Sequence, residues 1–195
     1  MLSFVPFRIS IIKLQLILLV LIMPAIPATI FAEDLTGSNI WSRAQDSLSQ
    51  TWQSENYELY IPVDTWHNRS YYSKEQIDSF NEQPWGLGVG KYRFDDDGNW
   101  NGLYAMAFID SHNDIEPVAG YGFQKIWHPT VNFRLGAGYT AGLTMRESTN
   151  YIPFPIILPL LSAGYKQLDM QATYVPGIGK GNGNILFTWL RWQIE

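Results

Sequence analysis

Residues 100–110 read WNGLYAMAFID, and their alternation decides the fold class. Side chains of a β-strand point alternately to opposite faces. One face here is aliphatic and the other mostly aromatic or long: Leu103, Ala105, Ala107 and Ile109 against Trp100, Tyr104, Met106 and Phe108. Segment 154–165 is also apolar on both faces, whereas strands around a water-filled lumen alternate with polar residues. The sequence therefore predicts strands with an apolar exterior and a partly hydrocarbon-like interior.

Turn residues divide the chain into eight strand-like segments. These are 57–67, 85–94, 100–110, 116–127, 131–145, 155–165, 168–176 and 184–194. Most have the 9 to 12 residues that a tilted strand needs to cross a bilayer. We expect an all-β fold, an eight-stranded antiparallel transmembrane β-barrel over 56–195.

An amphipathic helix is predicted over 39–54, within an N-terminal periplasmic segment 33–55. Ile40, Ala44, Leu48 and Trp52 recur at helical spacing. Two interpretations stay open: a helix packed on the domain, or an interfacial helix with Trp41 and Trp52 in the headgroup layer.

Residues 1–32 have the pattern of a secretory signal peptide. A basic start with Arg8 and Lys13 leads into the apolar run 14–23, and the segment ends at Ala32 before Glu33 and Asp34. The alternative is an uncleaved anchor helix, which the two prolines at 24 and 27 disfavour. Removal of the signal would leave 163 residues, enough for one domain.

Composition narrows the class of protein further. Residues 33–195 carry 11 basic and 18 acidic residues, a balance of −7 that argues against a nucleic-acid partner. The chain has no cysteine, which excludes disulfides, and aromatic residues make up 15% of it. An exported, acidic, aromatic-rich chain without long apolar helices fits the outer membrane of a Gram-negative bacterium.

Strand counting brings a histidine, a carboxylate and a hydroxyl to one rim. His67 ends the first segment, and Asp110 and Ser111 follow the third, so all three lie at the end where both termini are absent. Outer-membrane barrels keep their termini in the periplasm, which places these residues on the cell-exterior side. They are the groups that general-base and acyl-transfer chemistry requires. His128 falls on the opposite rim, so no metal cluster is expected.

Glycines suggest space inside the barrel. In segment 116–127, Ala119, Tyr121 and Phe123 share the face suited to lipid, and Gly120 and Gly122 share the other. Glycine inside a strand often marks the close approach of a ligand. It also serves barrel curvature, so a pocket for an acyl chain and a bore filled with side chains both remain open.

Several longer motifs resemble the lipid A palmitoyltransferase family of the PagP and Rcp type. They are YELYIP leading to TWH (57–67), PWGLG (84–88), GNWNGLYAMAF (98–108), Asp110-Ser111, EPVAGYG (116–122), NYIP (150–153) through LPL (158–160), and YVPG (174–177). The likeness runs from about residue 41 to the end of the chain.

The resemblance implies an outer-membrane acyltransferase that moves a palmitoyl chain from the sn-1 position of a glycerophospholipid to lipid A. It implies catalytic roles for His67, Asp110 and Ser111, with Asp110 orienting or charge-stabilising the imidazole. It also implies an acyl-length ruler at Gly122. The prolines of the family's lateral lipid openings are matched by Pro62 with Pro84 and by Pro159 with Pro176.

No cofactor is expected, and the expected partners are the phospholipid donor, lipid A and the outer membrane. The protein is expected to act as a monomer, with a homodimer as the alternative. Two other classes of function were weighed. A non-catalytic barrel with a structural or adhesive role explains the strands but not the clustered rim residues. A soluble lipid carrier would need a polar exterior.

Overall fold

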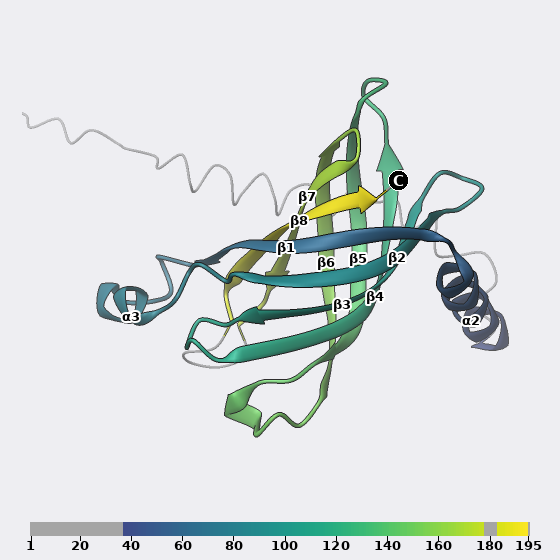
Figure 1. Cartoon of the computed structure of the whole chain (residues 1–195). Helices are drawn as coiled ribbons and strands as arrows, with labels where there is room; N and C mark the ends of the chain where they lie inside the picture. Colours follow the sequence, from purple (N-terminus) through teal and green to yellow (C-terminus); the bar gives the residue numbers. More distant parts are fainter. Residues whose placement is uncertain (1–36, 178–182, 195) are drawn as a thin grey trace, which may run out of the picture. The chain divides into compact units, whose positions relative to one another are not determined.

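The computed structural model describes residues 37–177 and 183–194; the predicted signal peptide lies outside them. Residues 45–195 belong to one compact unit. Its eight strands are antiparallel, each pairs with its neighbours in the chain, and the first also pairs with the last to close the barrel (Figure 1). The predicted eight-stranded antiparallel barrel is confirmed.

The strand ends agree with the sequence-based expectation to within two residues. The strands are β1 (Asn56–His67), β2 (Gly86–Phe94), β3 (Trp100–Ile109), β4 (Ile115–Trp127), β5 (Phe133–Thr144), β6 (Phe154–Tyr165), β7 (Leu168–Val175) and β8 (Ile185–Ile194). Turn chemistry explains the agreement. Between β2 and β3, for example, Asp95 Oδ1 accepts the main-chain N–H groups of Asp97 and Asn99, and Gly98 takes a positive φ of 78°.

Three short helical elements accompany the strands. The predicted N-terminal helix is α2 (Gly37–Gln53), whose Ser47 hydroxyl lies 3.0 Å from Asn101 Oδ1. Helix α3 (Lys74–Ser79), between β1 and β2, was not predicted from the sequence; a capping box of Ser73 and Gln76 begins it. A 3-10 turn, η3 (Glu147–Thr149), precedes β6. None of the helices in the described part of the chain is long and apolar enough to cross a membrane.

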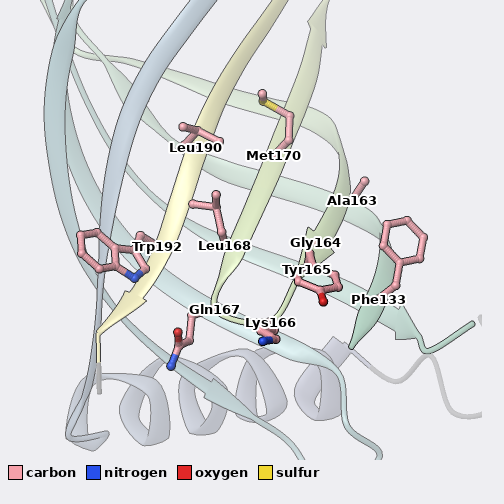
Figure 2. A pocket seen from close by; sticks show the side chains of 10 residues that line it. All are labelled: Phe133, Ala163, Gly164, Tyr165, Lys166, Gln167, Leu168, Met170, Leu190 and Trp192. Atoms are coloured by element: carbon pink, nitrogen blue, oxygen red, sulfur yellow. The ribbon is translucent and has the colours of Figure 1, made fainter. Parts of the chain in front are cut away.

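The outer wall of the barrel is apolar. Exposed aliphatic side chains cover it, among them Leu87, Val89, Leu135, Leu143, Ile157 and Leu161. Exposed aromatic residues lie towards both ends, with Tyr57, Trp127, Tyr165 and Trp192 at one and Trp85 and Tyr151 at the other. Figure 2 shows a shallow outer groove in which Leu168, Met170, Leu190 and Trp192 lie side by side. An apolar band with aromatic borders is the surface of an outer-membrane barrel.

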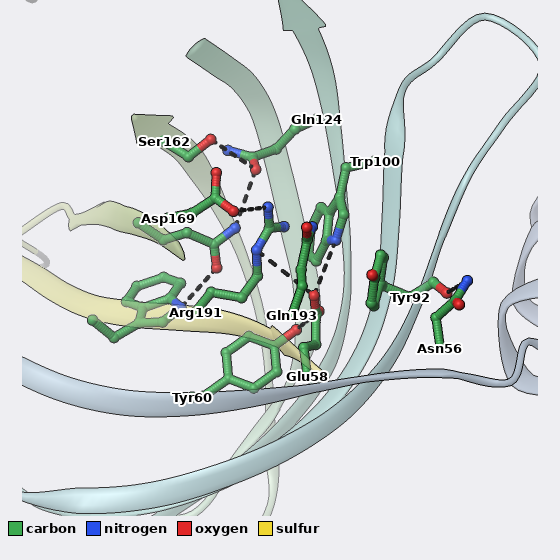
Figure 3. Close-up of polar contacts among 12 residues, drawn as sticks. Asn56, Glu58, Tyr60, Tyr92, Trp100, Gln124, Ser162, Asp169, Arg191 and Gln193 are labelled. Carbon is green, nitrogen blue, oxygen red and sulfur yellow. Dashed lines mark hydrogen bonds and ion pairs between the residues drawn. The ribbon is translucent and has the colours of Figure 1, made fainter. Parts of the chain in front are cut away.

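The interior is polar in the half next to the chain termini, here called the terminal half. The guanidinium of Arg191 contacts Asp169 at 2.7 Å and Glu58 at 3.7 Å, and it lies 4.2 Å from the centre of the Trp100 ring (Figure 3). Tyr60 donates a hydrogen bond to Glu58. All five side chains are fully buried, so the charges are compensated inside the bore.

The other half of the bore, here called the His67 half, is lined by apolar side chains. Along β3 the inward residues run from Trp100 through Tyr104 and Met106 to Phe108, just before the β3–β4 turn. Phe187 stacks on Phe108 with ring centres 4.7 Å apart. The expected partly hydrocarbon-like interior is therefore present mainly in this half, where Glu116 and Thr144 form a buried polar pair among the apolar side chains.

Two interruptions break the hydrogen-bonded wall in the described residues. The β1–β2 ladder stops at Tyr60 and Gly88, although β1 continues to His67. The β6–β7 ladder stops at Leu160 and Thr173, so residues 154–159 of β6 pair with β5 alone. Both interruptions lie in the His67 half of the barrel.

Candidate active site

A β-bulge turns His67 into the barrel. Glu58 and Tyr60 are buried on the inner face of β1, so strict alternation from them would point His67 outward. The register against β8 instead shifts between Pro62 and Asp64. The extra residue moves the odd-numbered positions to the inner face, and the His67 side chain is 1% exposed.

Ser111 lies against the imidazole of His67, as the sequence predicted. Its Oγ is 2.9 Å from Nε2 of His67, and the serine is buried in the turn after β3. Asn81 holds this turn from the neighbouring segment, because its main-chain N–H donates to the carbonyl of Ser111 at 2.9 Å. Hydroxyl and imidazole are thus at hydrogen-bonding distance.

Asp110 lies beside Ser111 but serves the turn. Its Oδ1 accepts the main-chain N–H groups of His112 at 2.8 Å and Asp114 at 2.9 Å. Among the described residues no hydrogen bond or ion pair joins it to His67, in contrast to the expectation that it orients the imidazole. In this structure its carboxylate shapes the loop that presents Ser111.

The carboxylate at the imidazole belongs to Glu82, in the segment between α3 and β2. Its Oε1 lies 3.0 Å from Nδ1 of His67 and also accepts the main-chain N–H of His67 at 3.0 Å. Arg69 pairs with both oxygens of the same carboxylate. Strand counting could have placed Glu82 at this rim, because it lies just before β2. Its contact with His67 could not be predicted, because the 68–85 segment contains a helix that the sequence pattern does not indicate.

Aromatic rings fix the plane of the imidazole. Phe80 stacks on it with ring centres 4.3 Å apart, and Tyr72 meets its edge at 5.6 Å. The hydroxyl of Tyr72 donates to the carbonyl of Gly183, just before the neighbouring strand β8. The ring has little freedom to rotate away from Ser111 and Glu82.

The contacts define one tautomer of His67. A carboxylate only accepts hydrogen bonds, so Nδ1 carries the proton towards Glu82 and the lone pair of Nε2 faces the hydroxyl of Ser111. This assignment follows from the hydrogen-bond partners. A hydroxyl, a base aligned on it and a carboxylate behind the base form the arrangement that activates an oxygen nucleophile.

The other histidines do not share this geometry. His112 is exposed, and its ring centre lies 5.8 Å from that of Phe80. His128 follows β4 at the opposite end of the barrel. Within residues 37–177 and 183–194, no three His, Asp or Glu side chains are grouped as they would be around a metal ion.

Gly122 faces the interior where the two halves of the bore meet. A Cβ atom at this position would lie 2.7 Å from the Trp100 ring and 3.4 Å from Leu160. Of the two interpretations left open for these glycines, the indole of Trp100 fills the space next to Gly122.

The four prolines border the interruptions of the wall. Pro62 lies at the bulge of β1, and Pro84 lies two residues before β2. Pro159 is the first β6 residue beyond the β6–β7 ladder, and Pro176 follows β7. Proline has no N–H to donate, so neither ladder can continue through these positions unchanged.

Comparison with known proteins gives a consistent result. Residues 47–191 match the family described as "Antimicrobial peptide resistance and lipid A acylation protein PagP". A protein named lipid A acyltransferase PagP from Laribacter hongkongensis is 58% identical over 154 residues, 79% of this chain and 74% of its own. Proteins of the same name from Pectobacterium carotovorum (53% identical; 83% and 77% covered) and Proteus mirabilis (51%; 78% and 73%) are also similar.

The pairing with Arg69 gives Glu82 an unusually low pKa, which can be tested. Hydrogen bonds from Arg69 hold the pKa of Glu82 at about 2, well below its ordinary value. A depressed carboxyl pKa stabilises the fold above the ordinary value, and this stabilisation disappears as the pH falls towards 2. In Arg69→Gln we expect the pKa of Glu82 to rise, as followed by carboxyl ¹³C NMR in micelles. Glu75, exposed on α3, is the internal control and should titrate identically in both proteins; an unchanged Glu82 would contradict the assignment.

Proposed function

The chain belongs to the PagP family of lipid A acyltransferases, and from this premise we propose that it transfers a palmitoyl chain from the sn-1 position of a glycerophospholipid to a hydroxyl group of lipid A. The observation that carries the proposal is the contact of 2.9 Å between Ser111 Oγ and His67 Nε2 above an apolar bore. A base beside a hydroxyl supplies the chemistry, and the apolar side chains below it match the chemistry of a hydrocarbon chain.

In the proposed reaction His67 is the general base. It takes the proton of the attacking hydroxyl while that oxygen bonds to the ester carbonyl carbon, and it returns the proton to the glycerol oxygen as the ester bond breaks. If Ser111 attacks, the product is an acyl-serine and a lysophospholipid, and a lipid A hydroxyl then repeats the sequence on the acyl-serine. The hydrogen bond of Ser111 to the base favours this route. A direct transfer needs Ser111 to turn away from Nε2 and stabilise the oxyanion.

The apolar half of the bore has the depth of a palmitoyl chain. The Trp100 ring lies against Gly122, which pairs with Gly102, and β3 continues from there to Asp110. A rise of ~3.4 Å for each residue of this stretch and a strand tilt of about 40° give a depth of roughly 20 Å. An extended palmitoyl chain has about this length, so Trp100 would form the floor of the well and Gly122 would set its level.

We propose that lipids enter sideways through the two proline-bordered interruptions. A paired strand wall excludes a phospholipid, whereas residues without ladder bonds can separate at lower cost. The interruption at Pro62 and Pro84 lies next to His67, and that at Pro159 and Pro176 lies across the barrel. Two separate openings would let donor and acceptor reach one site.

The apolar wall and the family fit an outer-membrane protein. We propose that the His67 end faces the cell exterior, since both chain termini lie at the other end, and that one chain suffices for activity. The chief alternative, a non-catalytic barrel, leaves the aligned Ser111 and His67 without a role.

Replacement of the base tests the reaction directly. We expect His67→Asn to lower lipid A palmitoylation by ~10²- to 10⁴-fold, because Asn cannot accept the hydroxyl proton. The measurement is mass spectrometry of lipid A from cells that make each variant. His112→Asn, an exposed histidine of the same rim, should retain activity. A fully active His67→Asn barrel would exclude His67 as the base.

Substitution of Gly122 tests the floor of the well. A side chain at 122 must displace the Trp100 ring into the apolar half, so Gly122→Met should select acyl chains shorter than palmitoyl. Donors of graded chain length measure the preference. Ala119→Met, on the outer face of the same strand, should leave palmitoyl preferred. If Gly122→Met also prefers palmitoyl, another part of the protein limits the length of the acyl chain.

Replacing prolines of the wall by valine, which has a main-chain N–H, tests whether lipids enter sideways. In the double variant Pro159→Val and Pro176→Val, the β6–β7 ladder can extend, and we expect acyl transfer to fall several-fold while the barrel becomes harder to unfold in urea. Pro117→Val is the control and should leave transfer unchanged, since Pro117 pairs with Ala107 of β3 outside both interruptions. Undiminished transfer by a double variant with a stiffened wall would speak against this opening.

A further inference from the structure

We propose that Glu82, held by Arg69, is a positioning residue that fixes the tautomer of His67 and stabilises the imidazolium formed during transfer. The expected effect of Glu82 on the transfer rate rests on the proposed function. Its expected effect on the His67 tautomer rests only on the contacts between the two residues. It assigns to the 68–85 segment a part in catalysis.

One oxygen of Glu82 makes both contacts to His67. Oε1 accepts the ring Nδ1–H and the main-chain N–H of the same residue, each at 3.0 Å. Two bonds from one acceptor fix the backbone and the ring of His67 relative to each other. The position of Nε2 opposite Ser111 then follows, because Phe80 already fixes the ring plane.

The base needs a counter-ion because it is buried. The His67 side chain is 1% exposed, and a proton on its ring would place a positive charge where water cannot solvate it. The Glu82 carboxylate, 25% exposed, is the acidic group in contact with this ring in the described chain. Its negative charge lies next to the ring that would carry the positive charge during transfer.

Arg69 keeps the carboxylate charged and in place. Its two terminal nitrogens pair with the two oxygens of Glu82, and Nη1 also donates to the carbonyl of His67 at 3.0 Å. Residues 67, 69 and 82 thus form a closed set of contacts. Asp110 cannot substitute for Glu82 here, because its Oδ1 already accepts two main-chain N–H groups of its own turn.

Two variants of Glu82 separate charge from shape. Glu82→Gln keeps the volume but removes the charge and allows an N–H group to face Nδ1, whereas Glu82→Ala removes every contact. The control is Glu75→Gln, the same change at an exposed position of the same segment. Folding of each variant is verified by heat-modified mobility in detergent.

Kinetics with a palmitoyl phospholipid and lipid A give the first measurement. For Glu82→Gln we expect kcat to fall by ~10²- to 10⁴-fold, with KM for the phospholipid unchanged. An amide N–H that faces Nδ1 favours the tautomer protonated on Nε2, and this nitrogen then cannot accept the hydroxyl proton. Glu75→Gln should match the wild type. A kcat for Glu82→Gln within a few-fold of the wild type, or a loss confined to KM, would overturn the positioning role.

Imidazole ¹⁵N NMR of histidine-labelled barrels gives a measurement that needs no activity. The wild type should show His67 protonated on Nδ1 and unprotonated on Nε2, and Glu82→Ala should show a mixture. An unchanged tautomer in Glu82→Ala overturns the inference; should that variant not fold, the isosteric Glu82→Gln carries the same test. If the wild type transfers no acyl chain but the tautomer depends on Glu82, the proposed function fails and the positioning role stands.

Discussion

The buried guanidinium of Arg191 is the interaction on which the arrangement of the bore depends. A cation inside a barrel must be compensated, and Glu58 and Asp169 do so from opposite sides while Trp100 stacks on the guanidinium face. This cluster fills the terminal half of the interior. The apolar side chains of the core lie mostly in the other half, towards His67, so the polar half confines a hydrocarbon chain to that side.

One irregularity of β1 links the wall to the chemistry. The bulge between Pro62 and Asp64 gives His67 its inward direction, and the β1–β2 ladder ends just before it. The segment that follows β1 then returns along the unpaired end of this strand and brings Glu82 to the imidazole. A regular strand would pair along its whole length and would need a different residue to carry the base, which explains why the site lies next to the interruption of the ladder.

Much of this architecture could be predicted from the sequence, because it depends on local chemistry. Asp, Asn, Gly and Pro mark the turns, and strand counting then places His67 and Ser111 at one rim. The bulge could not be predicted, since alternation alone does not show an extra residue. Glu82 was missed because its contact depends on how 68–85 folds, and the indole filling the space at Gly122 depends on packing across the barrel.

The central claim is that the acyl chain occupies the His67 half of the bore with its ester at Ser111 and its methyl end at Trp100. Intermolecular NOE spectroscopy tests this most directly, with a non-hydrolysable palmitoyl phospholipid analogue labelled at the terminal methyl and at the glycerol, added to the barrel in micelles. The account predicts NOEs from the methyl group to the Trp100 indole and from the glycerol to His67. NOEs confined to outer-wall residues such as Leu168 and Trp192 would contradict it.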